Sequence, residues 1–147
     1  MEKNKRLKSF NRVMLIDDNF IDNFVHKKLL ESLKISNNTT EFTSAPKAIE
    51  YLKLFNCFAI QPNKNHIDLI LLDINMPEMD GWGFIEEYKK ACNNEKSKTI
   101  IIVLSSSANK VDIERSQDEQ FLSGFIQKPL TMEKLSNCLE SIGPTKE

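Results

Sequence analysis

The sequence has few cysteines and few histidines. Its three cysteines, Cys57, Cys92 and Cys138, are odd in number, lie far apart and form no CxxC pair. This usage argues against a disulfide framework and against a zinc cluster, and we expect reduced, partly buried thiols. The two histidines, His26 and His66, have no partner at metal-ligand spacing. We therefore expect both histidines, and Cys57 with them, to lie on the surface.

The sequence also lacks an excess of charge and any long apolar run. Twenty Lys and Arg residues stand against 21 Asp and Glu residues, which gives a net charge of −1. Such a chain has no global field that would hold a nucleic acid or an anionic membrane surface. Its longest apolar runs, such as residues 100–104, are far shorter than the roughly 18–20 residues that a membrane-spanning helix requires, and residues 1–12 contain no signal-peptide core. We expect a cytoplasmic protein without a nucleic-acid or membrane partner.

The overall composition is that of an ordinary globular protein. The 147 residues are 40% hydrophobic and 28% charged, which predicts one compact domain. Residues 1–11 are rich in basic side chains and show no apolar periodicity, so we expect a flexible basic tail. The domain is expected at residues 12–142, followed by a short C-terminal tail at 143–147, because Gly143 and Pro144 stop the last helix. The tail is too short for an output module, so we expect a stand-alone domain.

Strand-like and helix-like segments alternate along this domain. Unbroken apolar runs occupy residues 13–16, 67–72 and 100–104, with a weaker run at 124–127 and a short strand expected at 41–43. Nearly wholly apolar strands are typical of a parallel sheet that helices cover on both faces. The sequence therefore predicts a doubly wound α/β domain of about five strands and five helices.

The helices are predicted from apolar stripes of helical period. Residues 109–120 fit least well because they contain only two apolar side chains, and residues 57–66 are expected to form an extended loop. The clearest stripes are Ile21, Phe24, Val25, Leu29 and Leu33; Ala48, Ile49, Leu52 and Phe55; Phe84, Ile85, Tyr88, Ala91 and Cys92; and Met132, Leu135, Leu139 and Ile142.

Polar side chains follow directly where the predicted strands end. Asp17 and Asp18 close the first strand, Asp73 the third, Ser105 the fourth and Lys128 the fifth. The carboxyl ends of parallel strands meet at one edge of the sheet, where such folds place their functional groups. Three carboxylates gathered there repel one another unless a cation compensates them. Because the available ligands are hard oxygens with no neighbouring His or Cys, the sequence predicts a Mg²⁺ site.

Beside such an ion, Asp73 has the chemistry of a nucleophile toward phosphorus. Carboxylates form aspartyl phosphates, and phosphoryl transfer depends mainly on positioning and on neutralising the phosphoryl oxygens. Mg²⁺, the Lys128 ammonium and the Ser105 hydroxyl would supply that neutralisation. The simpler alternative for Asp73, a helix cap, is disfavoured because Pro77 and Gly81 indicate a loop before the next helix.

Four elements in chain order resemble the response-regulator receiver domain. They are Asp-Asp at 17–18, Asp-Ile-Asn-Met-Pro-Glu-Met-Asp-Gly at 73–81, Ser105, and Lys-Pro at 128–129. The resemblance covers about residues 12–142. It implies the flavodoxin-like, CheY-like fold with five parallel strands in the order 2-1-3-4-5.

The resemblance also implies a role for each matching position. Asp73 would be phosphorylated by a histidine kinase or a phosphotransfer protein, and Lys128 would pair with the phosphoryl group. The peptide bond between Lys128 and Pro129 would be cis. The metal ligands implied are Asp17, Asp18, Asp73 and the main-chain carbonyl of Asn75. Ser105 would be the switch hydroxyl and Phe125 the switch aromatic, although a plain core position suits Phe125 equally well.

The resemblance further implies a signalling output through protein contacts. The expected surface comprises the fourth helix, the fifth strand and the fifth helix, which would bind a downstream protein target or a second copy in a phosphorylation-dependent homodimer. Trp82, beside Gly81 and Gly83, is expected either to pack on the adjacent loop or to contact a partner.

Two other functions compete with this interpretation. Haloacid-dehalogenase-type phosphatases also use an aspartate nucleophile with Mg²⁺, but they carry a second aspartate two residues on, where this chain has Asn75. Without that general acid, substrate turnover is not expected, and we do not predict a dedicated enzyme. A receiver-like scaffold that is never phosphorylated is the second alternative. The intact set of Asp73, Ser105 and Lys128 argues against it.

Overall fold

The computed structural model describes residues 9–55, 57, 66–95, 98–107 and 109–142. Within these ranges, five strands alternate with five helices, as the apolar patterns predict. In chain order they are β1 (Val13–Ile16), α1 (Phe20–Ser32), β2 (Thr39–Phe42), α2 (Ala45–Leu54), β3 (Leu69–Asp73), α3 (Gly81–Ala91), β4 (Ile100–Ser105), α4 (Lys110–Asp118), β5 (Gly124–Gln127) and α5 (Met132–Ile142).

The five strands form one parallel sheet in the order β2-β1-β3-β4-β5, which confirms the expected fold. Every residue of β1, β3 and β4 is buried, whereas the edge strands β2 and β5 are mostly half-buried. This difference explains the sequence pattern, because only strands covered on both faces need an unbroken apolar run. The edge strand β2 lies at 39–42 rather than at 41–43.

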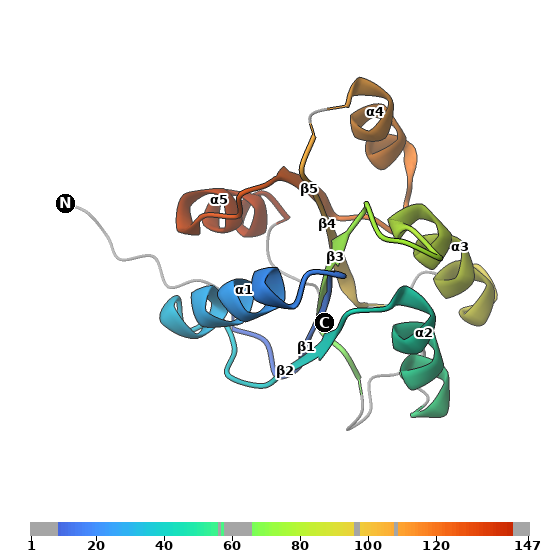
Figure 1. Ribbon diagram of the computed structural model, residues 1–147, viewed down its shortest axis with the longest axis horizontal. Coiled ribbons are helices and arrows are strands. Elements are labelled where there is room, and N and C mark those ends of the chain that lie inside the picture. The colour runs from blue at the N-terminus through green and yellow to red at the C-terminus, as the bar shows by residue number, and fades with distance from the viewer. Residues whose placement is uncertain (1–8, 56, 58–65, 96–97, 108, 143–147) are drawn as a thin grey trace.

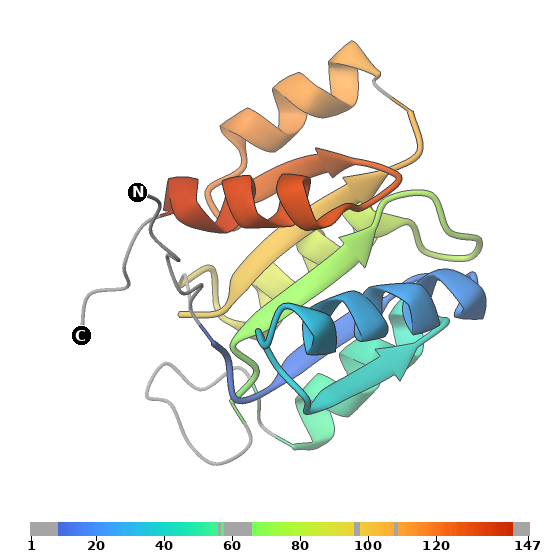
Figure 2. The same cartoon turned by 90° about the vertical axis from the view of Figure 1, so that its left-hand side faces the viewer.

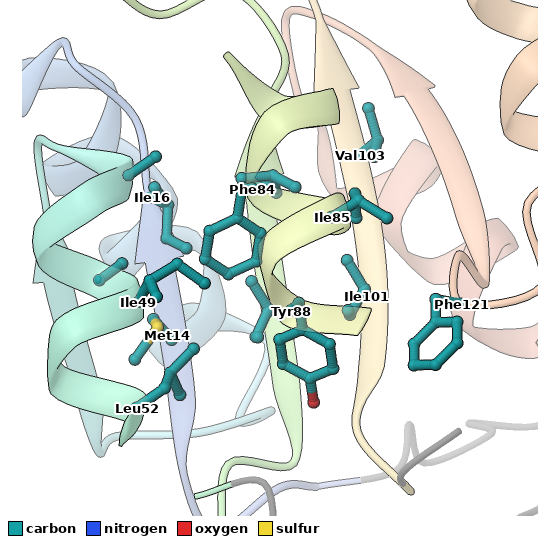
Figure 3. Close-up of a cluster of buried hydrophobic side chains, with 14 of the residues drawn as sticks. Met14, Ile16, Ile49, Leu52, Phe84, Ile85, Tyr88, Ile101, Val103 and Phe121 are labelled. Carbon is teal, nitrogen blue, oxygen red and sulfur yellow. The ribbon is translucent and has the colours of Figure 1, made fainter. Parts of the chain in front are cut away.

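Helices cover both faces of this sheet (Figure 1). α1 and α5 lie on one face, whose core includes Leu15, Leu71 and Leu135. α2 and α3 lie on the other face, over a larger core that contains Phe84 and Tyr88 (Figure 3). Two layers of side chains on a single sheet thus hold the strand ends in register.

α1 differs from its predicted orientation. Its buried positions are Asn23, His26 and Leu30, which are three and four residues apart and form one helical face. The stripe predicted from Ile21, Phe24, Val25, Leu29 and Leu33 is therefore wrong in its first half, since Ile21, Phe24 and Val25 are exposed, and only Leu29 and Leu33 pack on the core.

Both histidines contradict the expected surface location. His26 is only 5% exposed, and burial lowers the pKa of its imidazole from the usual value. Burial likewise lowers the pKa of His66, whose side chain is mostly covered. All three thiols are free, as expected. Cys57 is buried rather than at the surface, Cys92 is buried as well, and Cys138 is half-buried.

α4 has little apolar contact, in agreement with the poor pattern over 109–120. Ser116 is its only buried residue. The helix is tied to α3 by polar contacts instead: the indole Nε1 of Trp82 donates to Asp112 Oδ1 at 3.1 Å, and the Arg115 guanidinium lies 4.4 Å from the centre of the Trp82 ring. Trp82 is 7% exposed, so it packs between two helices rather than standing free.

Several predictions fall on residues outside the described ranges. They concern residues 1–8 of the expected basic tail, residues 58–65 of the expected loop, and the expected C-terminal tail at 143–147. Among the helices that the structure does describe, none combines the length and apolar character needed to cross a bilayer.

Candidate functional site

The polar strand ends meet at the carboxyl edge of the sheet, toward which all five strands point (Figure 2). β1 leads into Asp17 and Asp18, β3 ends with Asp73, and β4 ends with Ser105. Lys128 follows β5, and its backbone N–H donates to the carbonyl of Ser105 at 2.7 Å. Four segments far apart in the sequence therefore contribute to one place.

Three carboxylates form a close acidic cluster there. Asp17, Asp18 and Asp73 each offer a carboxylate oxygen, and these oxygens lie within 4.8 Å of one another. Asp17 and Asp73 are buried, at 2% and 4% exposure, while Asp18 is exposed. Hard oxygen donors, two of them shielded from water and one open to it, suit a divalent ion such as Mg²⁺ that retains part of its water shell. The residues present therefore fit the ion that the sequence predicts.

The Lys128 ammonium lies among these carboxylates. Its Nζ donates to Asp17 Oδ2 at 2.6 Å and to Asp22 Oδ2 at 3.1 Å, and it lies 3.5 Å from Asp73 Oδ1. Burial by itself would lower the pKa of Lys128. The hydrogen bond and charge of Asp17, together with the charge of Asp73, outweigh burial and raise this pKa above its usual value. Lys128 is therefore a fixed positive charge beside Asp73.

The electrostatics of Asp73 follow from the same arrangement. Burial, reinforced by the charge of Asp17, raises the pKa of Asp73 to about 6, although Lys128 acts in the opposite direction. The carboxylate is thus poorly compensated by the protein alone. A cation bound by the cluster would favour the ionised form, which is the form that can act as a nucleophile.

Ser105, Asn75 and Phe125 stand in different relations to Asp73. The Ser105 hydroxyl is fully buried; it donates to the carbonyl of Ser107 at 3.0 Å and accepts from the Ser107 N–H at 3.2 Å. The backbone N–H of Asn75 approaches Asp73 Oδ1 at 3.4 Å, while the Asn75 side chain is exposed. Phe125 is half-buried against the core under α2 and α3.

The loop after Asp73 returns closely to the strand end. The Gly81 N–H donates to the carbonyl of Ile74 at 2.8 Å. A Cβ on Gly81 would lie 2.8 Å from Ile74 Cα and 2.9 Å from the Asp73 carbonyl oxygen. Only glycine permits this approach. The Asp80 side chain then accepts from the Gly83 N–H at 2.8 Å and caps α3.

Two residues of α1 complete the site, and the sequence reasoning missed both. Asp22 binds Lys128, and Asn23 donates through Nδ2 to the backbone carbonyls of Asp17, at 3.2 Å, and Phe42, at 3.1 Å. The available signal was a polar pair in the first turns of a helix that follows Asp17 and Asp18. Periodicity assigned that face to solvent because both side chains are polar.

Comparison with known proteins agrees with this geometry. A family model described as the response regulator receiver domain matches residues 13–140. The chain is 32% identical over 139 residues to the sensor histidine kinase CheAY of Helicobacter pylori, which covers 94% of this chain but 16% of that protein. It is 27% identical over 129 residues to the two-component response regulator 24 of Arabidopsis thaliana, covering 88% of this chain and 81% of that protein.

Solved structures show the same architecture. A two-component response regulator from Cytophaga hutchinsonii matches with a TM-score of 0.79 and 28% identity, over 92% of this chain and 98% of that chain. The CheX-CheY-BeF3-Mg²⁺ complex from Borrelia burgdorferi matches in fold, with a TM-score of 0.72 and 20% identity, over 91% and 90% of the two chains. With the family model spanning nearly all of the domain and the fold and acidic cluster in agreement, the chain belongs to the response regulator receiver domain family, which is not a family of dedicated enzymes.

Proposed function

We propose that this chain is a phosphoacceptor in a two-component or phosphorelay system and that Asp73 receives the phosphoryl group. The observation that carries the proposal is the buried Asp73 carboxylate, grouped with Asp17 and Asp18 and 3.5 Å from the Lys128 ammonium. In the reaction, an Asp73 oxygen bonds to phosphorus. The bond from phosphorus to the donor's histidine nitrogen breaks, and its electron pair stays on the imidazole.

The surrounding residues would serve this transfer. Asp17, Asp18, Asp73 and the main-chain carbonyl of Asn75 would hold Mg²⁺, which would neutralise the phosphoryl oxygens when bound. Lys128 would neutralise another oxygen. Ser105 would exchange its hydrogen bonds to Ser107 for one to the phosphoryl group. The Phe125 ring, as the switch aromatic, would then change its position.

A small-molecule phosphodonor tests the proposal without a kinase. Incubation with acetyl phosphate and Mg²⁺ should add one phosphoryl group, detected by intact mass, and removal of Mg²⁺ with a chelator should prevent it. Asp73→Asn should abolish the addition, because the amide lacks the charge needed for attack. Asp118→Asn, on the exposed end of α4, is the matched control and should be labelled like wild type. Full labelling of Asp73→Asn would refute the assignment.

The first two turns of α1 offer a docking surface for the protein phosphodonor. Phe20, Ile21, Phe24 and Val25 are 69%, 57%, 55% and 49% exposed, and we call them the α1 patch. The patch begins two residues after Asp18, so it flanks the acidic cluster. A donor must bring its phosphohistidine to Asp73, and an apolar surface at this position suits the helical domain of a histidine kinase or phosphotransfer protein.

A substitution within the α1 patch separates docking from chemistry. Phe24→Ser should leave labelling by acetyl phosphate unchanged and should slow transfer from a phosphorylated protein donor. Leu54→Ser is the control, because Leu54 is 76% exposed at the end of α2 that leads away from the site. Equal transfer rates for wild type and Phe24→Ser would exclude the α1 patch as the docking surface.

The output would pass through α4, β5 and α5 to a downstream protein or to a second copy of the chain. The polar attachment of α4 to Trp82 supports this assignment, because a helix with one buried residue can shift at low cost. Size-exclusion chromatography with and without acetyl phosphate distinguishes a homodimer from a monomer that awaits another partner.

A further inference from the structure

The Lys128 ammonium is shared unequally among its carboxylate neighbours. Its two hydrogen bonds run to Asp17 Oδ2, at 2.6 Å, and Asp22 Oδ2, at 3.1 Å, while Asp73 lies farther away at 3.5 Å. The lysine expected to serve the phosphoryl group is thus anchored on the α1 side of the site. Asp22 belongs to the first turn of α1 and lies 106 positions before Lys128.

Both oxygens of Asp17 already have partners. Oδ1 accepts from the backbone N–H of Asn19 at 2.9 Å, and Oδ2 accepts from Lys128. A divalent ion bound by Asp17 therefore competes with the Lys128 ammonium for the same carboxylate. Without a second partner, a largely buried ammonium that lost Asp17 would be left poorly compensated.

Asp22 meets the requirements of that second partner. It stands outside the set of Asp17, Asp18 and Asp73 that groups around a candidate metal position. Its side chain is 37% exposed, so water still solvates its carboxylate, and the positive end of the α1 dipole favours an anion in this first turn. It binds the Lys128 amine at 3.1 Å without belonging to that set.

We propose that Asp22 is a positioning residue that retains Lys128 when a divalent ion takes Asp17, so that ion binding does not expel the lysine from reach of Asp73. The inference rests on the proposed phosphoacceptor function and adds a fourth carboxylate to it. Asp22 acts through Lys128 and is not itself a ligand.

A calorimetric titration of Mg²⁺ into the unphosphorylated protein tests this role without any activity measurement. Asp22→Asn should raise the Mg²⁺ dissociation constant about two- to fivefold, the range expected when a partly exposed ion pair is lost. Glu133→Gln is the matched control, since it removes one exposed charge from the first turn of α5. It should leave the constant unchanged. Asp22→Glu should restore most of the affinity.

A double-mutant cycle distinguishes positioning from a general effect of charge. In a Lys128→Met background no ammonium competes for Asp17, so the further change Asp22→Asn should have little effect on Mg²⁺ affinity. In the phosphorylation assay, Asp22→Asn should raise the Mg²⁺ concentration for half-maximal rate but should not lower the rate at saturating Mg²⁺. A structural defect would also lower the rate at saturating Mg²⁺.

The outcomes separate this inference from the function on which it rests. Equal Mg²⁺ affinity of wild type and Asp22→Asn, or an equal loss in the Lys128→Met background, would overturn the role of Asp22 while labelling at Asp73 remained intact. Absence of labelling at Asp73 would overturn the phosphoacceptor function even if the cycle showed coupling. Absence of Mg²⁺ binding to wild type would overturn both.

Discussion

The raised pKa of Asp73 predicts that its ionised carboxylate lowers the free energy of unfolding of the protein. In the metal-free fold this pKa is about 6, against 3.8 for an unperturbed aspartate, because of burial first and of Asp17 second. The difference of about 2 corresponds to about 3 kcal/mol. Between pH 4 and 6 the native state binds a proton that the unfolded chain has released, so stability falls as pH rises through this window and is then level.

Asp73→Asn removes the charge and keeps the shape of the side chain. Lys128 is not left unpaired, since Asp17 at 2.6 Å and Asp22 at 3.1 Å retain it. In buffer with a chelator at pH 7.5, the variant should be more stable than wild type by up to about 3 kcal/mol, or roughly 6–12 °C in Tm for a domain of this size. At pH 4 and below, the difference should vanish.

Urea unfolding at the two pH values measures this difference. Glu140→Gln, an exposed carboxylate of α5, is the control and should change stability by less than about 0.5 kcal/mol. Saturating Mg²⁺ should stabilise wild type more than the variant and narrow the gap. A less stable Asp73→Asn at pH 7.5 would refute the reasoning, because the attraction of Lys128 for Asp73 would then exceed the penalty of burial.

Four further substitutions address the loops and helices around the site. Gly81→Ala should lower the free energy of unfolding by about 1–3 kcal/mol, because its Cβ would meet backbone atoms at 2.8 and 2.9 Å. Gly83→Ala is the control and should be tolerated, because its Cβ would meet the flexible Met79 side chain. Equal Tm values for the two variants would contradict this reasoning. Asp112→Ala should expose the chain's one tryptophan, so that iodide quenches its fluorescence more strongly; unchanged quenching would show that the hydrogen bond does not hold α4. Ser107, which is uncharged, small and exposed two residues after Ser105, should leave the path of the attacking water open, so the phosphoryl lifetime should be moderate. Ser107→Arg should change the dephosphorylation rate without preventing phosphorylation, and an unchanged decay rate would mean that Ser107 does not line that path.

The fold could be predicted from sequence because its signals are local. The runs at 13–16 and 100–104 are unbroken, since strands buried on both faces admit few polar side chains. Each run ends in a polar residue at the same edge of the sheet, so the sequence alone could place Asp17, Asp73 and Ser105 close together. The weak apolar pattern of 109–120 likewise indicated a helix with little core contact.

The features that the sequence did not predict depend on tertiary contacts, which leave no local pattern in the sequence. Asn23 faces inward because the carbonyls at the ends of β1 and β2 need a donor, and a periodicity argument assigns such a side chain to solvent. His26 follows it onto the buried face. The hydrogen bond between Lys128 and Asp22 joins residues 106 positions apart and depends on how the start of α1 and the segment after β5 meet at one edge of the sheet.

The most direct test of the central claim identifies the residue that carries the phosphoryl group. The wild-type chain would be incubated with acetyl phosphate and Mg²⁺, the acyl phosphate reduced with borohydride, and the peptides sequenced by mass spectrometry. We expect one reduced residue, Asp73, in the peptide that contains the end of β3 and the loop to Gly81. Modification of Asp17, Asp18 or any other residue in its place, or no modification despite bound Mg²⁺, would contradict it.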